Sequence, residues 1–475
     1  MNYPFWNVPY IGGGWVIGLI AIFHVMIALF AVGGGSYLVL AEQKALREGR
    51  RDWLVVLRGH SKFFLILTGV FGTVSGVGIW FAIGLANPEA TSTLIHNFVF
   101  GWAMEWVFFI VELTTAAVYY YTWGRVSDSL HVKVGWLYAV SSFFTLVIIN
   151  GILAFMLTPG EAWLAVAGTG QEASRFWQAF FNPTYWPNLA IRSLICASLA
   201  GVWALVTCSR IDGAKEPALK TSLVRWSAKW LLPTFVLLPV ALGWYLWTVP
   251  ESQRALLRLG ISTIGSGMFT QVTRVALIVV LASASIVAVT YFFAWRSPVE
   301  FNFSQAMSVV LLALIATASG EYARETLRKP YVIGRHMYSN GVRVTDVPKL
   351  NAEGYLTRSP WKVATHDTKL ARGEAMFRGQ CMACHTVDGY RSIKRLLGER
   401  NREAIGNLLT ILHEHKPDSP YRAFMPPLVG TKDEIEALGD YLATLTAPEA
   451  AEAEKPEEKA AGMEKQTSAA SPGRR

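Results

Sequence analysis

Five consecutive residues near the end of the 475-residue chain carry its clearest chemistry: Cys381, Met382, Ala383, Cys384 and His385. C-x-x-C-H is the attachment motif of a c-type haem. The two thiols form thioethers to the porphyrin, and the adjacent imidazole is held under the iron. The motif therefore predicts electron transfer through one covalent haem c. Because such attachment happens on the outer face of an energy-transducing membrane, it also predicts that this segment lies on that face.

The sixth iron ligand should lie downstream, on the opposite side of the iron. Met425 is the best candidate, because the two prolines after it stiffen its loop. A thioether ligand also raises the reduction potential relative to a second imidazole. His413 and His415 are the alternatives, in a polar stretch before a turn.

The sequence around the motif predicts a small helical domain over residues 367–447. A short helix is expected at residues 372–377, before the motif. A closing amphipathic helix is expected from Thr431 to Leu445, with a capping box between Thr431 and Glu434. This stretch resembles class I mono-haem cytochrome c. The alternatives are a chance occurrence of the motif or a zinc site.

The rest of the chain has the composition of a membrane protein: 52% of the residues are hydrophobic and only 16% are charged. We expect an all-α, polytopic bundle of about eight transmembrane helices. The first apolar run lacks the features of a cleaved signal peptide and is interpreted as a retained span. The predicted spans are 14–41, 61–86, 98–121, 133–157, 189–208, 229–249, 273–295 and 303–320.

The loops predict the orientation of the bundle. Residues 44–62 and 210–229 are rich in Lys and Arg, whereas residues 87–97 have neither and residues 158–188 have only Arg175. The positive-inside rule then places the N-terminus outside, and an even number of spans brings the C-terminus outside too. We expect a multi-pass protein of the plasma (inner) membrane. The net charge of +9 fits basic loops beside anionic lipid and requires no nucleic acid.

Four regions follow from this organisation. Residues 1–328 form the bundle, and residues 329–366, rich in Pro and Gly, form a connector over the outer surface. Residues 367–447 form the haem domain. Residues 448–475 have almost no large apolar residue and are predicted to be disordered.

Ionisable residues at membrane depth are costly, so they indicate function. His24, Glu105 and Glu325 are all expected in the outer half of the bundle, where they would form a cradle for haem. Glu112 lies seven residues beyond Glu105 on the same helix face. The alternative for each is a hydrogen bond between helices.

Other polar residues lie near the ends of the predicted helices. Arg192 and Arg274 would either bind haem propionates or extend to the membrane surface. His60, His96 and His131 are expected at the membrane interface.

The bundle resembles subunit I of the cytochrome bd quinol oxidases over about residues 15–330. The resemblance rests on Phe23-His24, on Glu105 and Glu112 followed by Trp123-Gly124-Arg125, on Asn150-Gly151, and on the segment from Glu325 through Arg328 to Tyr331. It implies that His24, Glu105 and Glu325 are ligands of b- or d-type haems, with Arg328 in the same cofactor-binding segment. It implies a proton-delivery role for Glu112, although the spacing from Glu105 is one residue shorter than usual. It also implies a second membrane subunit.

The departures from that family concern its low-spin haem. Its His and Met ligands are replaced by Arg192 and Ala276, the loop at 250–272 is far shorter than the family's quinol-binding loop, and the family's final helix is missing. The haem c would then replace quinol as the entrance for electrons. We expect a respiratory oxidase that takes electrons from a periplasmic donor, such as a cytochrome, and reduces oxygen in the bundle. The alternatives are an electron-transfer subunit between quinone and a periplasmic complex, and a non-catalytic anchor for the haem domain.

Overall fold

The computed structural model describes residues 6–251, 254, 270–359 and 368–446. The predicted disordered tail at 448–475 and most of the short loop at 250–272 lie outside the described residues. Within them the chain is almost entirely helical, and only one two-stranded sheet is present. The predicted all-α fold is confirmed.

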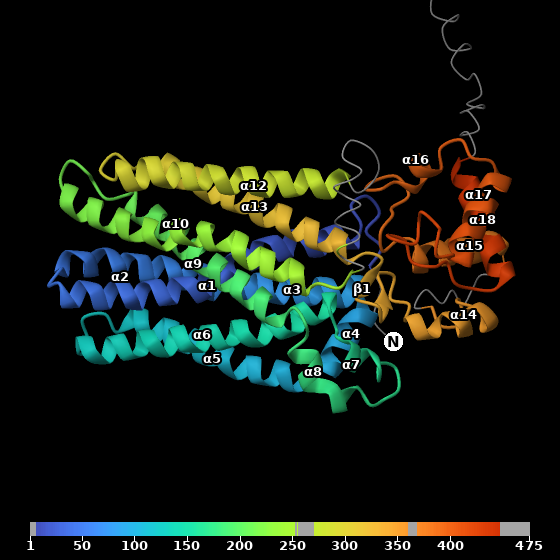
Figure 1. Cartoon of the computed structure of the whole chain (residues 1–475), viewed down its shortest axis with the longest axis horizontal. Coiled ribbons are helices and arrows are strands. Elements are labelled where there is room, and N and C mark those ends of the chain that lie inside the picture. The colour runs from blue at the N-terminus through green and yellow to red at the C-terminus, as the bar shows by residue number, and fades with distance from the viewer. Residues whose placement is uncertain (1–5, 252–253, 255–269, 360–367, 447–475) are drawn as a thin grey trace, which may run out of the picture.

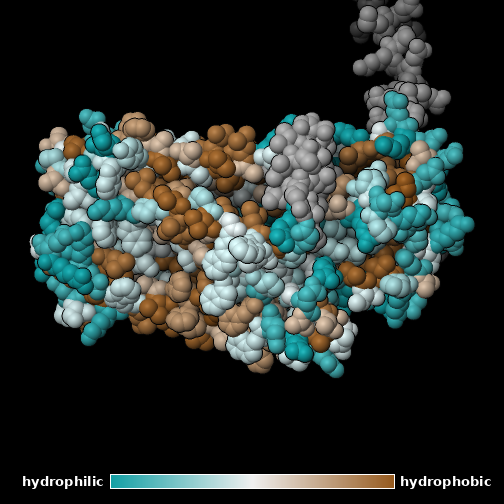
Figure 2. Space-filling model, viewed as in Figure 1, coloured by the Kyte–Doolittle hydropathy of each residue, from teal (hydrophilic) through white to brown (hydrophobic). Residues whose placement is uncertain are grey.

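Eight helices are long and apolar enough to cross a membrane among the residues that the structure describes, as predicted. They run roughly parallel to the long axis of the molecule (Figure 1). Figure 2 shows hydrophobic side chains over the middle of this bundle and hydrophilic ones at the end away from the C-terminal segment. The spans are α1 (Gly13–Arg47), α2 with α3 (Arg51–Ile66 and Thr73–Ala86, joined by a π-helical segment at Leu67–Gly72), α5 (Val99–Tyr121), α6 (Asp128–Leu157), α9 (Tyr185–Cys208), α10 (Pro217–Thr248), α12 (Thr270–Val289, extended by a π-helical segment to Arg296) and α13 (Phe303–Arg328).

Short elements connect the spans at the end that faces the C-terminal segment. Asn87 caps α4, and its side chain accepts a hydrogen bond from the Ala90 amide. At the opposite end Ser127 caps α6, and Asn302 forms a capping box with Gln305 at the start of α13. The short elements are α4 (Pro88–Asn97), α7 (Glu161–Leu164), a 3₁₀ turn (Glu172–Arg175) and α8 (Phe176–Phe180).

Helix α1 lies at the centre of the bundle, where it contacts α2, α3, α6, α9 and α13. Its middle contains Gly33, Gly34 and Gly35, which are all buried. A Cβ on Gly33 would overlap the carbonyl group of Cys196 on α9. The missing side chain therefore lets the two backbones approach closely, as small residues do in membrane helices.

The C-terminal segment forms a second hydrophobic core at one end of the bundle (Figure 1). Helices α15 and α18 pack against each other, and α17 packs on α18. The predicted capping box forms: the Thr431 amide donates to Glu434, and the Glu434 amide donates to the Thr431 hydroxyl. The elements are β1 (Tyr331–Ile333), β2 (Met337–Tyr338), a 3₁₀ turn (Val344–Asp346), α14 (Val347–Glu353), α15 (Lys369–Gln380), α16 (Ile393–Leu397), α17 (Arg402–Glu414) and α18 (Lys432–Thr446).

The contact between α1 and α9 gives the first prediction. Gly33→Ala adds a Cβ that overlaps backbone atoms, so the helices must separate, at a cost of about 1–3 kcal/mol. Thermal unfolding in detergent should show a clear loss of stability. Gly59→Ala is the matched control, because nothing lies within 4 Å of its Cβ position. Equal stability of the two variants would contradict the close packing.

Candidate functional site

A cavity of about 980 Å³ lies between the bundle and the C-terminal segment. Its volume is in the range of cofactor sites. Residues of α1, α3, α5, α6 and α13 line it, and so do Cys384 and His385 of the haem-attachment motif. The two parts of the chain for which the sequence predicts haem ligands therefore line the same cavity.

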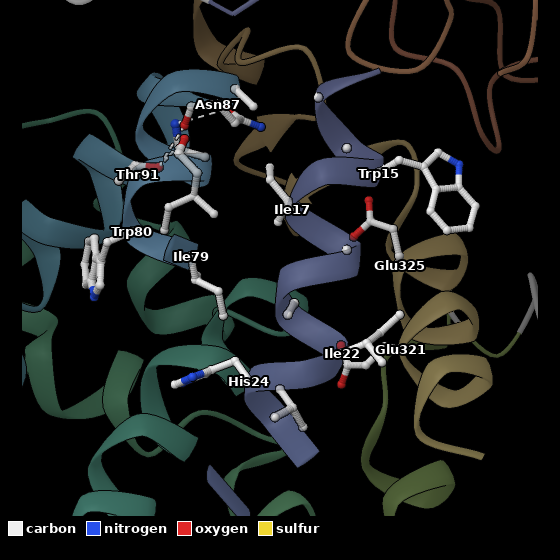
Figure 3. Close-up of a pocket in the computed structure, with 18 of the residues that line it drawn as sticks. Trp15, Ile17, Ile22, His24, Ile79, Trp80, Asn87, Thr91, Glu321 and Glu325 are labelled. Carbon is white, nitrogen blue, oxygen red and sulfur yellow. Dashed lines mark hydrogen bonds between the residues drawn. The ribbon is translucent and has the colours of Figure 1, made fainter. Parts of the chain in front are cut away.

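His24 enters this cavity from α1. Its Nδ1 atom lies 3.1 Å from the Ser75 hydroxyl, which leaves Nε2 available to an iron atom. A Cβ on Gly76 would come within 3.2 Å of the imidazole, so this glycine makes room for the ring. In Figure 3 His24 projects from one side of α1, whereas Glu321 and Glu325 lie on the other side. The predicted ligands thus face two parts of the cavity.

Glu105 and Glu112 both line the cavity from α5. Glu105 is half-buried, whereas Glu112 is buried, with 8% of its surface exposed. The Tyr138 hydroxyl lies 3.0 Å from a Glu112 carboxylate oxygen and 3.0 Å from the Ala31 carbonyl. Glu112 is therefore held by a hydrogen bond at the inner end of the cavity.

A cluster of charges lines the cavity at the ends of α9 and α13. It comprises Arg192, Glu321, Arg324, Glu325, Arg328 and Lys329. Arg324 pairs with Glu321 at 2.7 Å, and Glu325 pairs with Arg328 and, at 3.1 Å, with Lys329. Four cations thus face two carboxylates, a surplus of two positive charges. The Nε atom of Arg328 is buried without a hydrogen-bond partner among the described residues.

The haem-attachment motif forms one turn after α15. The His385 amide donates to the Cys381 carbonyl at 2.9 Å, and the His385 Nδ1 lies 3.0 Å from the Arg391 carbonyl. That carbonyl can only accept, so Nδ1 carries the proton and Nε2 is free for an axial bond. Burial lowers the pKa of His385, which favours the neutral imidazole that metal binding needs. Burial, with a smaller contribution from the Cys384 thiol, raises the pKa of Cys381 to about 12.

A seam joins the C-terminal segment to the bundle beside this motif. The Tyr390 amide donates to the Tyr10 carbonyl at 2.7 Å, and the rings of Trp15 and Tyr390 meet edge to face at 5.5 Å. Tyr322 of α13 forms hydrogen bonds with Tyr390 and Arg391. The haem-attachment motif is therefore docked on the bundle through hydrogen bonds and a ring contact.

The cavity brings together His24, Glu105, Glu112, Glu325, Arg328, Cys384 and His385. It does not include Cys381, Arg274 or Met425. Arg274 is exposed on α12, and Met425 lies half-buried in the loop before α18. His60 and His131, which were expected at the membrane interface, are buried within the bundle, with 2% and 3% of their surface exposed.

Sequence reasoning missed several polar residues of the bundle. Tyr138 and Tyr322 were not singled out, because tyrosine is common in membrane helices and a hydroxyl alone does not identify a site. The buried pair of Glu42 and His131 was missed because both residues stand near helix ends, where polar side chains are ordinary. The spacing of seven residues between His131 and Tyr138 was the available signal.

Comparison with known proteins addresses the bundle. Residues 14–246 match the family model of cytochrome bd terminal oxidase subunit I. This confirms the expected likeness to subunit I over those residues, which include α1 to most of α10. The structure of bd oxidase from Geobacillus thermodenitrificans has the same fold, with a TM-score of 0.56 and 17% identity over 67% of this chain and 87% of that one. No curated protein sequence matches the chain.

Haem is the cofactor that this family implies, and the residues can be tested against it. His24 with a free Nε2 and the carboxylate of Glu105 fit as iron ligands, and the surplus positive charge beside Arg328 suits propionates. Glu325 would have to leave its ion pairs with Arg328 and Lys329 to bind iron. The positions expected to hold the family's low-spin haem carry no iron ligand. A guanidinium at Arg192 and a methyl group at Ala276 stand where its ligands are expected, and neither can bind iron.

The seam gives the second prediction. A Cβ on Gly389 would overlap the backbone of Tyr10, so Gly389→Ala should separate the C-terminal segment from the bundle locally. Hydrogen exchange at the Tyr390 amide should then become at least about tenfold faster, since its hydrogen bond would open more often. Gly406→Ala is the control, because its Cβ would meet only the flexible end of Arg402. Unchanged exchange in Gly389→Ala would show that the seam is not closed in solution.

Proposed function

We propose that this protein is a membrane haem oxidoreductase of a respiratory chain, which takes electrons through a haem c at Cys381, Cys384 and His385 and reduces oxygen at haems in the bundle. The continuous cavity carries this proposal. It is lined by His385 at one end and by His24, Glu105 and Glu325 within the bundle. Haems bound there would supply the one-electron carriers and the iron that binds oxygen.

The charged cluster supports an entrance for electrons other than quinol. Arg192 faces Glu321 and Arg324 in the region where the family holds its low-spin haem. An ion cluster of this kind stabilises buried charge but carries no electrons. With that route closed, the docked C-terminal segment supplies the entrance, and a periplasmic protein such as a cytochrome is the donor.

The residues of the bundle have separate tasks in this proposal. His24, Glu105 and Glu325 hold the cofactors, while Arg328 and Lys329 orient carboxylate groups by charge-assisted hydrogen bonds. Glu112 holds a proton at the inner end of the cavity, where its bond to Tyr138 keeps it in place. Glu105, two turns closer to the outer surface, would be the next group along this route and faces the cavity where haem would supply the oxygen chemistry.

The setting of the reaction follows from the predicted orientation. The haem c segment faces the periplasm, and the basic loops face the cytoplasm. We expect a second membrane subunit, like subunit II of the bd oxidases, on one of the exposed apolar faces of the bundle.

The third prediction tests the haem c. Replacement of both Cys381 and Cys384 with Ser removes the thiols that would form the thioether bonds. Haem staining of the denatured chain should vanish, and oxidation of a reduced periplasmic cytochrome should fall at least about a hundredfold, because electrons lose their entrance. The spectrum of non-covalent haem should remain. Cys208→Ala is the control, because this buried cysteine lies outside the cavity. Covalent haem in the double variant would refute the assignment.

One observation favours a second candidate, an electron-transfer subunit without oxygen chemistry. Glu325 is already paired with Arg328 and Lys329, so it is not free to bind iron unless those pairs rearrange.

The fourth prediction separates the two candidates. An oxidase should bind carbon monoxide at a high-spin haem when reduced, and Glu105→Ala should abolish that spectral change. Protein that neither binds carbon monoxide nor consumes oxygen would be the electron-transfer subunit.

A further inference from the structure

The second span contacts the central helix α1 through a face of small residues. Gly72 and Gly76 lie on this face, four positions apart, which is about one helical turn. A Cβ on Gly72 would lie 3.4 Å from Ile27 on α1, and a Cβ on Gly76 would lie 3.2 Å from the His24 ring. The missing side chains therefore let α3 approach α1 closely beside His24.

Ser75 lies next to Gly76 and contacts the His24 imidazole. Its hydroxyl oxygen lies 3.1 Å from His24 Nδ1, 2.6 Å from the Phe71 carbonyl oxygen and 3.1 Å from the Gly72 carbonyl oxygen. His24 lines the cavity, whereas Ser75 does not. Ser75 therefore contacts the ring from outside the cavity, where it would not touch a group bound within it.

The single proton of the Ser75 hydroxyl decides which nitrogen of His24 is protonated. A carbonyl oxygen can only accept, and the Phe71 carbonyl is the nearest partner, so the hydroxyl donates to it. The Ser75 oxygen then offers only lone pairs to His24, and Nδ1 must donate. The Gly72 carbonyl is a second acceptor beside the ring. His24 therefore carries its proton on Nδ1 and presents the lone pair of Nε2 to the cavity.

The main chain before Ser75 departs from an α-helix. Residues Leu67–Gly72 are π-helical, and the α-helix resumes at Thr73. Short π-helical turns within α-helices frequently occur at functional sites. Both carbonyl groups that Ser75 contacts belong to the last two residues of this segment. The change of helix type thus lies where the second span supplies hydrogen-bond acceptors for the imidazole.

We propose that Ser75 is a positioning residue for His24. Its hydroxyl accepts the Nδ1 proton, fixes the orientation of the ring and holds Nε2 toward the cavity as an iron ligand. A hydrogen bond at the far nitrogen also makes an imidazole a stronger electron donor, and its loss weakens metal binding by about 10–100-fold. The inference rests on the proposed function in one respect, namely that His24 binds a haem in the cavity.

The fifth prediction tests this role by resonance Raman spectroscopy of the reduced full-length protein in detergent. A high-spin haem held by a neutral histidine gives an iron–histidine stretching band, and His24→Ala should abolish the band that belongs to this residue. Ser75→Ala should move the band to lower frequency, because an imidazole without its acceptor is a weaker electron donor.

Retention of the non-covalent haem gives a second measurement. Each variant is mixed with excess apomyoglobin, and the transfer of haem is followed by absorbance. Ser75→Ala should lose haem at least about tenfold faster than the unmodified protein, because the bond between His24 and iron is weaker.

Two further variants serve as controls. Ser193→Ala, on α9, also removes a hydroxyl that bonds to the carbonyl four residues earlier, that of Leu189 at 2.8 Å, but Ser193 does not line the cavity. It should leave the band and the rate of haem loss unchanged. Ser75→Thr keeps a hydroxyl at the same position and should bring both measurements back toward those of the unmodified protein.

The outcomes separate this inference from the proposed oxidase. A shifted band and faster haem loss in Ser75→Ala alone support the positioning role, even if the unmodified protein consumes no oxygen, which would overturn the oxidase alone. An unchanged band in Ser75→Ala, an equal shift in Ser193→Ala, or no recovery in Ser75→Thr overturns the role. A band that is absent from the unmodified protein, or that survives in His24→Ala, overturns both His24 as a ligand and the role of Ser75.

Discussion

The close packing of α1 in the middle of the bundle is the constraint on which the rest of the structure depends. Without side chains at Gly33 to Gly35, α1 approaches α9 and the ring of Tyr138 on α6 at backbone distance. This fixes the positions of two residues along the bundle axis: His24, which precedes the glycines on α1, and Glu42, which follows them. The same helix begins beside the seam, where Tyr10 and Trp15 meet Tyr390. One central helix therefore sets the relative positions of the cavity, the buried pair of Glu42 and His131, and the docked C-terminal segment.

Charge compensation explains how so many ionisable groups persist within an apolar bundle. At the cavity, carboxylates alternate with guanidinium groups one turn apart on α13, so that each negative charge has a neighbour of opposite sign. At the other end of the bundle the same problem is solved by the contact between Glu42 and His131 Nδ1 at 2.7 Å. The first arrangement keeps charge and suits the binding of acidic groups. The second satisfies a buried carboxyl group by hydrogen bonds.

Much of the fold could be predicted from the sequence, because transmembrane helices need about twenty apolar residues and leave an unmistakable pattern. The candidate site was predicted less evenly. His24, Glu105 and Glu325 stood out because a charged residue is rare at membrane depth, and the structure places all three on one cavity. Arg274 does not line it, because the buried face of a helix depends on neighbours far away in the sequence. Met425 does not line it either, and it lies in the loop before α18. The contact between Glu42 and His131 was not predicted, since the two residues are 89 positions apart in the sequence.

The seam between the C-terminal segment and the bundle has a consequence for how the chain tolerates change. Its shortest link runs from the amide of Tyr390 to the carbonyl of Tyr10, so it is made by main-chain atoms alone. Substitutions at Tyr10 would leave this bond in place, and so would most substitutions at Tyr390. In this seam a side chain cannot be added at Gly389, because a Cβ there would overlap the backbone of Tyr10. Sequences that keep this glycine can therefore diverge widely around it while the two parts stay in register.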